Sequence, residues 1–274
     1  MSDALSQPPL HYKRPPVVER VLTIMADFPI ENFYSRFEDW KQLIHEKFPD
    51  HDPLSNWRLN VETQPDGTPL LTEVQPELVI THRFWRKNAQ GKRFLSMRLL
   101  PNQLTMNLHP DQAGAHRFSE LHAEFSYWLP LWLNHFGGTN CASVILNYIN
   151  LISQQTTPQF LDTNGGIQIG RTLRVFAGLP GRHMGIIPPY DCQMGLMIDP
   201  ERQSTFALRV AAVTVGRENS IAVRVDFNAV TSSPKPLTPL QALSEAEFLH
   251  NVIIGQFEAI FTDEAKKSFE PITA

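Results

Sequence analysis

Two stretches of this chain repeat one pattern at a fixed distance. Ser119–Phe136 reads SELHAEFSYWLPLWLNHF, and Ser244–Phe261 reads SEAEFLHNVIIGQFEAIF. Both begin with Ser-Glu, continue with apolar residues at helical spacing and end in Phe, and their first and last residues are each 125 positions apart. Both follow a run of strand-like segments. Because a repeated unit constrains the architecture before any single element is placed, the chain is predicted to contain one α+β unit twice.

The order of segments supports this prediction. Each half is predicted to run strand, helix, three-strand meander and helix. The predicted strands are 17–25, 78–85, 93–100, 103–109, 142–151, 193–198, 205–214 and 220–230, and the predicted helices are 33–48, 116–136, 240–264 and a single turn at 157–161. The predicted fold class is α+β, with two similar β-α-β-β-β-α halves that form antiparallel sheet and with the long helices packed on one face.

Three connecting segments lack a regular apolar pattern. The polar, proline-containing stretch 49–76 is predicted to be a loop, and 231–239 a proline-rich link. The segment 165–190 is predicted to be rich in loops, with one embedded strand at 171–176. The predicted organisation is an N-terminal arm at 1–16, a first half at 17–140 and a second half at 141–274, which together are able to pack as one compact domain.

Composition sets the class of protein. Of the 274 residues, 42% are hydrophobic and 19% are charged, which is typical of a globular protein and excludes disorder as the main state. The net charge of −4 means that only a local patch, not the whole molecule, attracts nucleic acid or anionic lipid. The sequence starts without the apolar core of a signal peptide and has no apolar run long enough to span a membrane. A cytoplasmic protein is expected, with Cys141 and Cys192 as reduced, buried thiols.

Two short motifs carry a family resemblance. Tyr12-Lys-Arg-Pro-Pro-Val-Val-Glu19 opens the first strand, and Asn147-Tyr148-Ile149-Asn150 lies in the strand after the Trp-rich helix. With the meander between them, these motifs resemble a sporadically distributed bacterial family of uncharacterised proteins of similar length. The resemblance covers most of the sequence. It implies no activity, so it transfers no catalytic residue to this protein.

Patterns that would indicate enzyme chemistry are weak. Gly165–Thr172 has the spacing of a phosphate-binding loop, but Arg171 replaces the lysine and a strand, not a helix, is predicted to follow. Neither His45 and His51 nor the set His109, His116 and His122 places two ligands one helical turn apart, as a helical zinc site requires. No nucleophile elbow is present. The sequence therefore predicts no catalytic residue, metal ligand or cofactor, and an enzyme is the least favoured class.

The distribution of charge gives the stronger functional signal. From Leu78 to Pro110 the sequence has six basic residues and no acidic one, with aromatic residues between them. Strand alternation places Arg98, Arg209 and Arg224 at equivalent outward positions. The final helix region, in contrast, is acidic. The predicted binding residues are Arg83, Trp85, Arg86, Lys92, Arg93, Arg98, Arg209 and Arg224.

Two interpretations of these residues remain open. In the simpler one, the arginines populate the solvated side of a half-exposed sheet and pair with neighbours such as Asp226. In the functional one, a basic sheet face and hairpin bind an anionic partner: a nucleic acid, an acidic protein surface or a phosphorylated ligand. A non-enzymatic binding protein is the first hypothesis. A small-ligand protein with a cavity between sheet and helices is the alternative, although the leucine, isoleucine, valine and phenylalanine of the inner strand faces favour a filled core.

Overall fold

The computed structural model describes residues 11–12, 15–28, 30–63, 69–109, 117–153, 157–161, 166–177, 190–215 and 220–272, and within 54–80 it describes the backbone alone. In these ranges nine strands form one antiparallel sheet, and a two-stranded sheet joins β1 (His11–Tyr12) to β11 (Pro271–Ile272) near the ends of the polypeptide. The α+β class with an antiparallel sheet is therefore confirmed.

The large sheet has the strand order β3-β4-β5-β6-β2-β7-β10-β9-β8. Its strands β2 and β7 pair with each other in the middle, and each is flanked by strands of its own half of the sequence. The strands are β2 (Val17–Ala26), β3 (Asp50–Thr63), β4 (Pro69–Lys87), β5 (Arg93–Leu100), β6 (Gln103–Leu108), β7 (Cys141–Ser153), β8 (Tyr190–Asp199), β9 (Ser204–Val215) and β10 (Ser220–Leu237).

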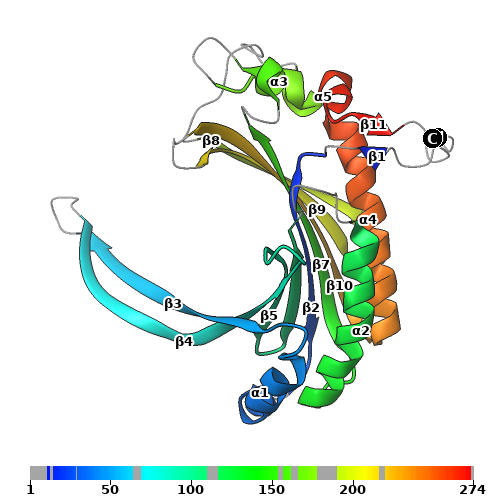
Figure 1. The fold of residues 1–274 in the computed structure, drawn as a ribbon. Helices are drawn as coiled ribbons and strands as arrows, with labels where there is room; N and C mark the ends of the chain where they lie inside the picture. Colours follow the sequence, from blue (N-terminus) through cyan, green and yellow to red (C-terminus); the bar gives the residue numbers. More distant parts are fainter. Residues whose placement is uncertain are drawn as a thin grey trace.

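Two long helices, α2 (Phe118–Phe136) and α4 (Pro239–Ile260), run side by side along the sheet, and α1 (Ile30–Ile44) lies beside one end of α2 (Figure 1). The sheet curves away from these two helices. We call the face that contacts α2 and α4 the helix face and the opposite, concave face the distal face. Among the described residues, no helix is long and apolar enough to cross a lipid bilayer.

The core fills the helix face. Phe227 of β10 contacts the ring of Phe257 on α4, and the Tyr148 hydroxyl of β7 hydrogen-bonds His250 Nδ1 at 2.8 Å. Trp132 of α2 is fully buried, with its ring centroid 5.3 Å from that of Phe28. Since side chains alternate across a strand, the residues between these contacts point to the distal face.

The helix ends follow from local sequence. Thr238 caps α4 in a reciprocal capping box with Gln241, and Pro239 occupies the first turn, where its missing N–H costs nothing. Gly137 ends α2 in the left-handed conformation that glycine adopts without steric cost. The predicted helix 240–264 is wrong in its last turn, because Thr262 caps a separate helix, α5 (Asp263–Ser268).

The predicted loop at 49–76 is wrong. This stretch forms β3 and the first part of β4, which pair from Asp50 opposite Trp85 to Thr63 opposite Pro69. The β3–β4 ribbon projects from the sheet (Figure 1), because β4 pairs with β5 only from His82 to Lys87. Trp57, Leu59 and Val61 do alternate with polar residues, but the many prolines and polar turn-forming residues of this stretch favour a loop.

Two other segments differ from the prediction. The strand predicted at 171–176 is instead α3 (Ile169–Thr172) followed by the 3₁₀ turn η2 (Arg174–Phe176), and a 3₁₀ turn η1 spans Pro158–Phe160. Leu173 and Phe176 are buried three residues apart, which fits helical turns better than a strand. The proline-rich link at 231–239 belongs to β10 as far as Leu237. Pro234 and Pro236 are tolerated in this strand because the pairing of β10 with β7 is irregular between Ser232 and Leu237.

Candidate functional site

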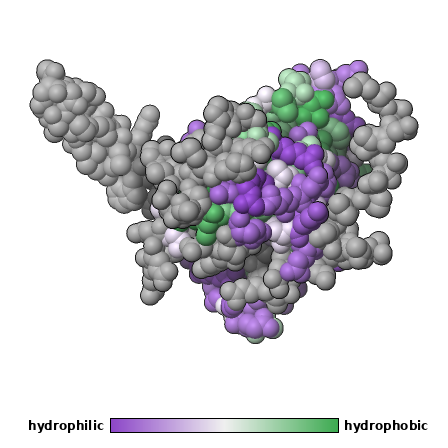
Figure 2. Space-filling view, turned by 90° about the horizontal axis from the view of Figure 1, so that it is seen from above, coloured by the Kyte–Doolittle hydropathy of each residue, from purple (hydrophilic) through white to green (hydrophobic). Residues whose placement is uncertain are grey.

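The distal face carries most of the predicted binding residues. On β4, Phe84 lies on the helix face, so Arg83 and Trp85 point to the distal face. On β5, the buried Met97 and Leu99 place Arg98 between them on the distal face. The same alternation puts Arg209 and Arg224 there. In the end-on view of the molecule, the described surface is mainly hydrophilic with smaller apolar areas (Figure 2).

Arg86 lies on the other face. Its guanidinium donates to both carboxylate oxygens of Glu124 on α2, at 2.6 and 3.0 Å, and stands 4.7 Å from the ring centroid of Phe48. This bidentate pair ties β4 to α2. Arg86 therefore holds the helix against the sheet, and the structure does not bring it together with the other predicted binding residues.

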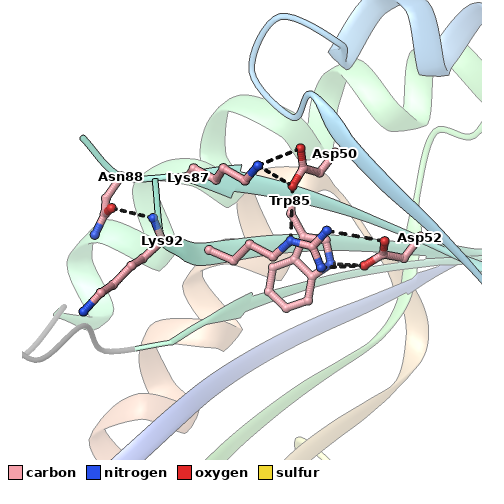
Figure 3. Close-up of polar contacts among 7 residues, drawn as sticks. Asp50, Asp52, Trp85, Lys87, Asn88 and Lys92 are labelled. Carbon is pink, nitrogen blue, oxygen red and sulfur yellow. Dashed lines mark hydrogen bonds and ion pairs between the residues drawn. The ribbon is translucent and has the colours of Figure 1, made fainter. Parts of the chain in front are cut away.

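The β4–β5 turn contains a compact charge network (Figure 3). Arg93 donates to Asp50 and Asp52, Lys87 pairs with Asp50 at 2.9 Å, and the Trp85 indole N–H donates to Asp52 at 2.8 Å. The hydrogen bond from Lys87 lowers the pKa of Asp50 against the opposing effect of burial. Asp50 and Asp52 on β3 thus neutralise Lys87 and Arg93. The charge count in the sequence analysis began at Leu78, so it did not include these two carboxylates.

Lys92 lies at the tip of the same turn. Its backbone N–H donates to the side chain of Asn88, and its exposed side chain points away from Asp50 and Asp52 (Figure 3). Such an exposed lysine keeps its hydration and adds little to a specific site.

The two arginines of the second half are also paired. Arg209 Nη2 donates to Asp191 Oδ2 at 2.6 Å, and Arg224 Nε donates to both oxygens of Asp226, at 2.8 and 2.9 Å. The hydrogen bond from Arg209 holds the pKa of Asp191 below its ordinary value. Asp226 is buried, whereas Arg224 is half-exposed. The simpler interpretation of these two residues, as arginines paired with neighbours, describes their geometry.

Arg83 and Arg98 differ from all the others. They lie directly opposite each other on β4 and β5, and both are half-buried. Within the described residues neither forms an ion pair with a carboxylate, and the Nε atom of each is buried without a hydrogen-bond acceptor. Burial lowers the pKa of Arg98, and the neighbouring charge of Arg83 lowers it further. Asp52 lies opposite Arg83 on β3, but its oxygens accept from Arg93 and Trp85.

More buried polar atoms without a partner surround this arginine pair. Within the described residues, Ser96 Oγ on β5, Asn107 Oδ1 on β6 and His109 Nε2 just after β6 are all buried and lack a hydrogen bond. Asn107 donates through its other amide atom to Glu19 on β2, whose Oε1 is 3.6 Å from His109 Nε2. We call Glu19, Arg83, Ser96, Arg98, Asn107 and His109 the central polar cluster. Sequence reasoning missed Glu19, Ser96 and Asn107, although each occupies a distal position in its strand, and it weighed His109 only as a metal ligand.

Trp85 covers one end of the cluster. It lies opposite Ser96, which is fully buried, and reaches His109 with 5.5 Å between ring centroids. The guanidinium of Arg83 stands 5.4 Å from the Trp85 ring and that of Arg93 stands 5.2 Å from it. These cation–π contacts are each worth about 0.5–1 kcal/mol at partly exposed sites. Trp85 therefore fixes Arg83 beside Arg98 despite their like charge.

Other chemistry has less support in the described residues. No three His, Cys, Asp or Glu side chains among them are placed to hold a metal ion. Cys141 and Cys192 are free thiols, and burial raises the pKa of Cys141 to about 12, which keeps its thiol protonated.

In the glycine-rich motif, Arg171 is bound by Glu264 and Gln168, and the Thr172 hydroxyl donates to a backbone carbonyl. Gly165 of that motif lies outside the described residues.

No protein-family model, curated protein or solved structure matches this sequence. The geometry of the central polar cluster is therefore the basis for a functional proposal.

Proposed function

We propose that this protein is a non-enzymatic binding protein that recognises an anionic partner on the distal face of its sheet, around Arg83 and Arg98. One observation carries the proposal: these two half-buried arginines face each other with no carboxylate partner among the described residues, whereas Arg93, Arg209 and Arg224 each have one. Two like charges held together favour binding of a negative group, because that group relieves their repulsion.

A protein partner fits this face better than a nucleic acid. A nucleic-acid groove needs a continuous positive surface along the phosphates. On the distal face, carboxylates alternate with the arginines: Asp50 and Asp52 lie on one side of the Arg83–Arg98 pair, and Asp191 and Asp226 belong to the other half of the sheet. This mixed pattern repels an extended polyanion, but it leaves a local positive site for an acidic group on a protein.

We also propose that the two halves derive from one duplicated unit, with 17–136 and 142–264 related by a pseudo-twofold axis between β2 and β7. The strand order supports it: β4-β5-β6 flanks β2 on one side, and β8-β9-β10 flanks β7 on the other. The extra strand β3 and the short turns in place of a second α1 are differences between the halves. An experimental structure whose halves fail to superpose strand for strand would contradict this duplication.

The binding proposal is tested by charge reversal at the pair. Arg83→Glu with Arg98→Glu is expected to abolish capture of the proteins that wild type binds reproducibly in extracts of its native host. The matched control is Lys92→Glu, which reverses an exposed charge on the same turn and is expected to keep the same partners. Arg86 and Arg93 are left intact, because their reversal would break ion pairs with Glu124, Asp50 and Asp52.

Two further measurements complete this test. Circular dichroism and thermal melting must show that the double variant is folded, because only a folded variant reports on binding. Binding of a single-stranded DNA or RNA oligonucleotide is measured in parallel across a salt series. Unchanged protein capture by the folded double variant, or oligonucleotide binding that depends on Arg83 and Arg98, would contradict the proposal of an acidic protein partner.

A further inference from the structure

The central polar cluster offers more than positive charge. Among the described residues, its buried Nε–H groups on Arg83 and Arg98 are donors without acceptors, and the buried Oδ1 of Asn107 is an acceptor without a donor. A buried polar atom left without a partner costs about 1–3 kcal/mol. A concentration of such atoms on three neighbouring strands is a place where a ligand group gains energy by supplying the missing partners.

The formal charge of the cluster limits the ligand. Arg83 and Arg98 contribute two positive charges, and Glu19, held by Asn107 and beside His109, contributes one negative charge. A monoanion neutralises this sum, whereas a dianionic phosphate would bring a second negative charge next to Glu19. A planar carboxylate also matches the edge of a guanidinium, where Nε–H and Nη–H point in parallel.

The unfilled acceptor adds a second requirement. Asn107 Oδ1 lies one strand away from Arg98, on β6, and is satisfied by a ligand that donates an N–H or O–H next to its anionic group. The carboxyl end of a polypeptide has this arrangement, because the amide N–H of the last residue is two bonds from its carboxylate carbon. An acidic side chain supplies the carboxylate alone.

We infer that Arg83 and Arg98 together bind one carboxylate group, with Asn107 receiving a donor from the same ligand where one is present. This inference rests on the proposed function and names the chemical class that the distal face recognises. Trp85 borders this site, since it lies opposite Ser96 and its ring stands beside the guanidinium of Arg83. The carboxylate is supplied either by the C-terminus of a polypeptide or by an acidic side chain.

The test follows the arginine Nε–H and tryptophan indole N–H signals by ¹⁵N NMR of the full-length protein. The probes are sodium acetate, N-acetylglycine and inorganic phosphate at matched ionic strength. We expect the Arg83 and Arg98 signals to shift saturably with both carboxylates, and at least tenfold more probe to be required with phosphate. N-acetylglycine binding more tightly than acetate identifies a C-terminal carboxylate as the source, and equal binding identifies an acidic side chain.

Variants separate binding from structure. Arg98→Met is expected to remove the acetate-induced shift of Arg83, and Arg83→Met that of Arg98, so the result does not depend on one variant folding. Arg93→Met serves as the control and should leave both shifts intact, because Arg93 is occupied by Asp50 and Asp52. In the Asn107→Leu variant, N-acetylglycine and acetate should bind with equal affinity.

Absence of a saturable shift, or phosphate binding equal to acetate binding, would overturn the carboxylate inference. The proposed function has a separate outcome. If protein capture still requires Arg83 and Arg98 while acetate and N-acetylglycine have no effect, the distal face binds an anionic partner of another class. If capture also ignores both arginines, the proposed function itself is wrong.

Discussion

The two faces of the sheet use their side chains differently. The helix face is mainly apolar, with large rings such as Trp132, Phe136 and Phe227 fully buried between the sheet and α2 and α4, although among the described residues Trp132 Nε1 is itself buried without a hydrogen bond. The distal face is polar, and it contains buried polar atoms without partners on β4, β5 and β6. Buried apolar area stabilises a fold, whereas an unsatisfied buried polar atom destabilises it. The apolar core is therefore concentrated on the helix face, and the distal face is the one on which we propose binding.

The distal face also differs between the two halves of the sequence. In the second half each of Arg209 and Arg224 has its own carboxylate, from Asp191 and Asp226. In the first half Arg83 and Arg98 face each other and, among the described residues, neither forms an ion pair with a carboxylate; Arg83 stacks on Trp85, and the charge of Glu19 acts on Arg98. Arginines on the same face of the sheet thus have different surroundings in the two halves. Whether an arginine on this face has a carboxylate partner depends on nearby residues rather than on the arginine itself.

The largest effect is expected on the helix face. Trp132→Ala removes a fully buried ring and should lower the free energy of unfolding by about 3–5 kcal/mol, measured by urea denaturation. The matched control on the same helix is Tyr127→Ala, whose side chain is exposed and whose loss should change stability by about 0.5 kcal/mol or less. A loss below about 1 kcal/mol for Trp132→Ala would mean that the helix face does not hold the core.

The next effect concerns pH and a histidine pair on the helix face. His51 Nε2 and His82 Nδ1 are 3.1 Å apart under Phe37, and burial, with the neighbouring His51, lowers the pKa of His82 to about 4. Because the pKa of His82 is lower in the folded state, the unfolded protein binds protons more readily. The stability from neutral His82 is thus fully present above pH ~6.5 and is lost as the pH falls toward 4.

This pH dependence is tested by urea denaturation at pH 7 and pH 4.5. For a half-buried pair, we expect wild type to lose about 1–2 kcal/mol more than His82→Gln between these pH values, after allowance for solvent screening. The exposed His45→Gln should behave as wild type. Equal losses for wild type and His82→Gln would show that His82 titrates alike in the folded and unfolded protein.

Much of the fold was predictable because its signals are local. Apolar residues at helical spacing predicted α2 and α4, and alternation predicted β5 and β9, since each element buries one face. Of the β3–β4 ribbon only 78–85 was predicted as strand, because the prolines and polar residues of 49–76 favoured a loop. The two helical turns at 169–176 were assigned to a strand because they are too short for their apolar spacing to be distinctive.

The site was predictable only in part, because it depends on which strands become neighbours. Alternation placed Arg98, Arg209 and Arg224 on one face, but it did not show that Asp191 would pair with Arg209 and that Arg83 would face Arg98. Glu19 precedes Asn107 by 88 positions in the sequence, and the pairing of β2 with β6 brings them together. Contacts between distant segments depend on the order of strands in the sheet, and local sequence patterns do not determine that order.

A smaller effect separates the arginines of the two halves. Arg224→Met leaves the buried carboxylate of Asp226 without its donor and should cost about 1 kcal/mol. Arg98→Met removes a like charge beside Arg83 and should leave stability unchanged or raise it by up to about 1 kcal/mol. Thermal and urea denaturation of both variants measure this difference. Equal destabilisation by the two substitutions would mean that Arg98 has a stabilising partner and that the halves do not differ.

The smallest effect on stability, and the closest comparison of the halves, comes from Asp191→Asn. Asp191 and Arg209 are both exposed, so loss of their ion pair should produce no measurable change in Tm. The substitution nevertheless leaves Arg209 without its hydrogen-bonded carboxylate, although Asp226 still lies opposite it on β10. If one unpaired arginine is sufficient for carboxylate recognition, acetate should shift the Arg209 Nε–H signal in the variant as strongly as it shifts Arg98. We expect only a weak, unsaturated shift, because Arg209 lacks a second guanidinium opposite it on β10, where Asp226 stands instead. A saturable shift at Arg209 would show that recognition needs an unpaired arginine alone, and that the facing pair of Arg83 and Arg98 is not required.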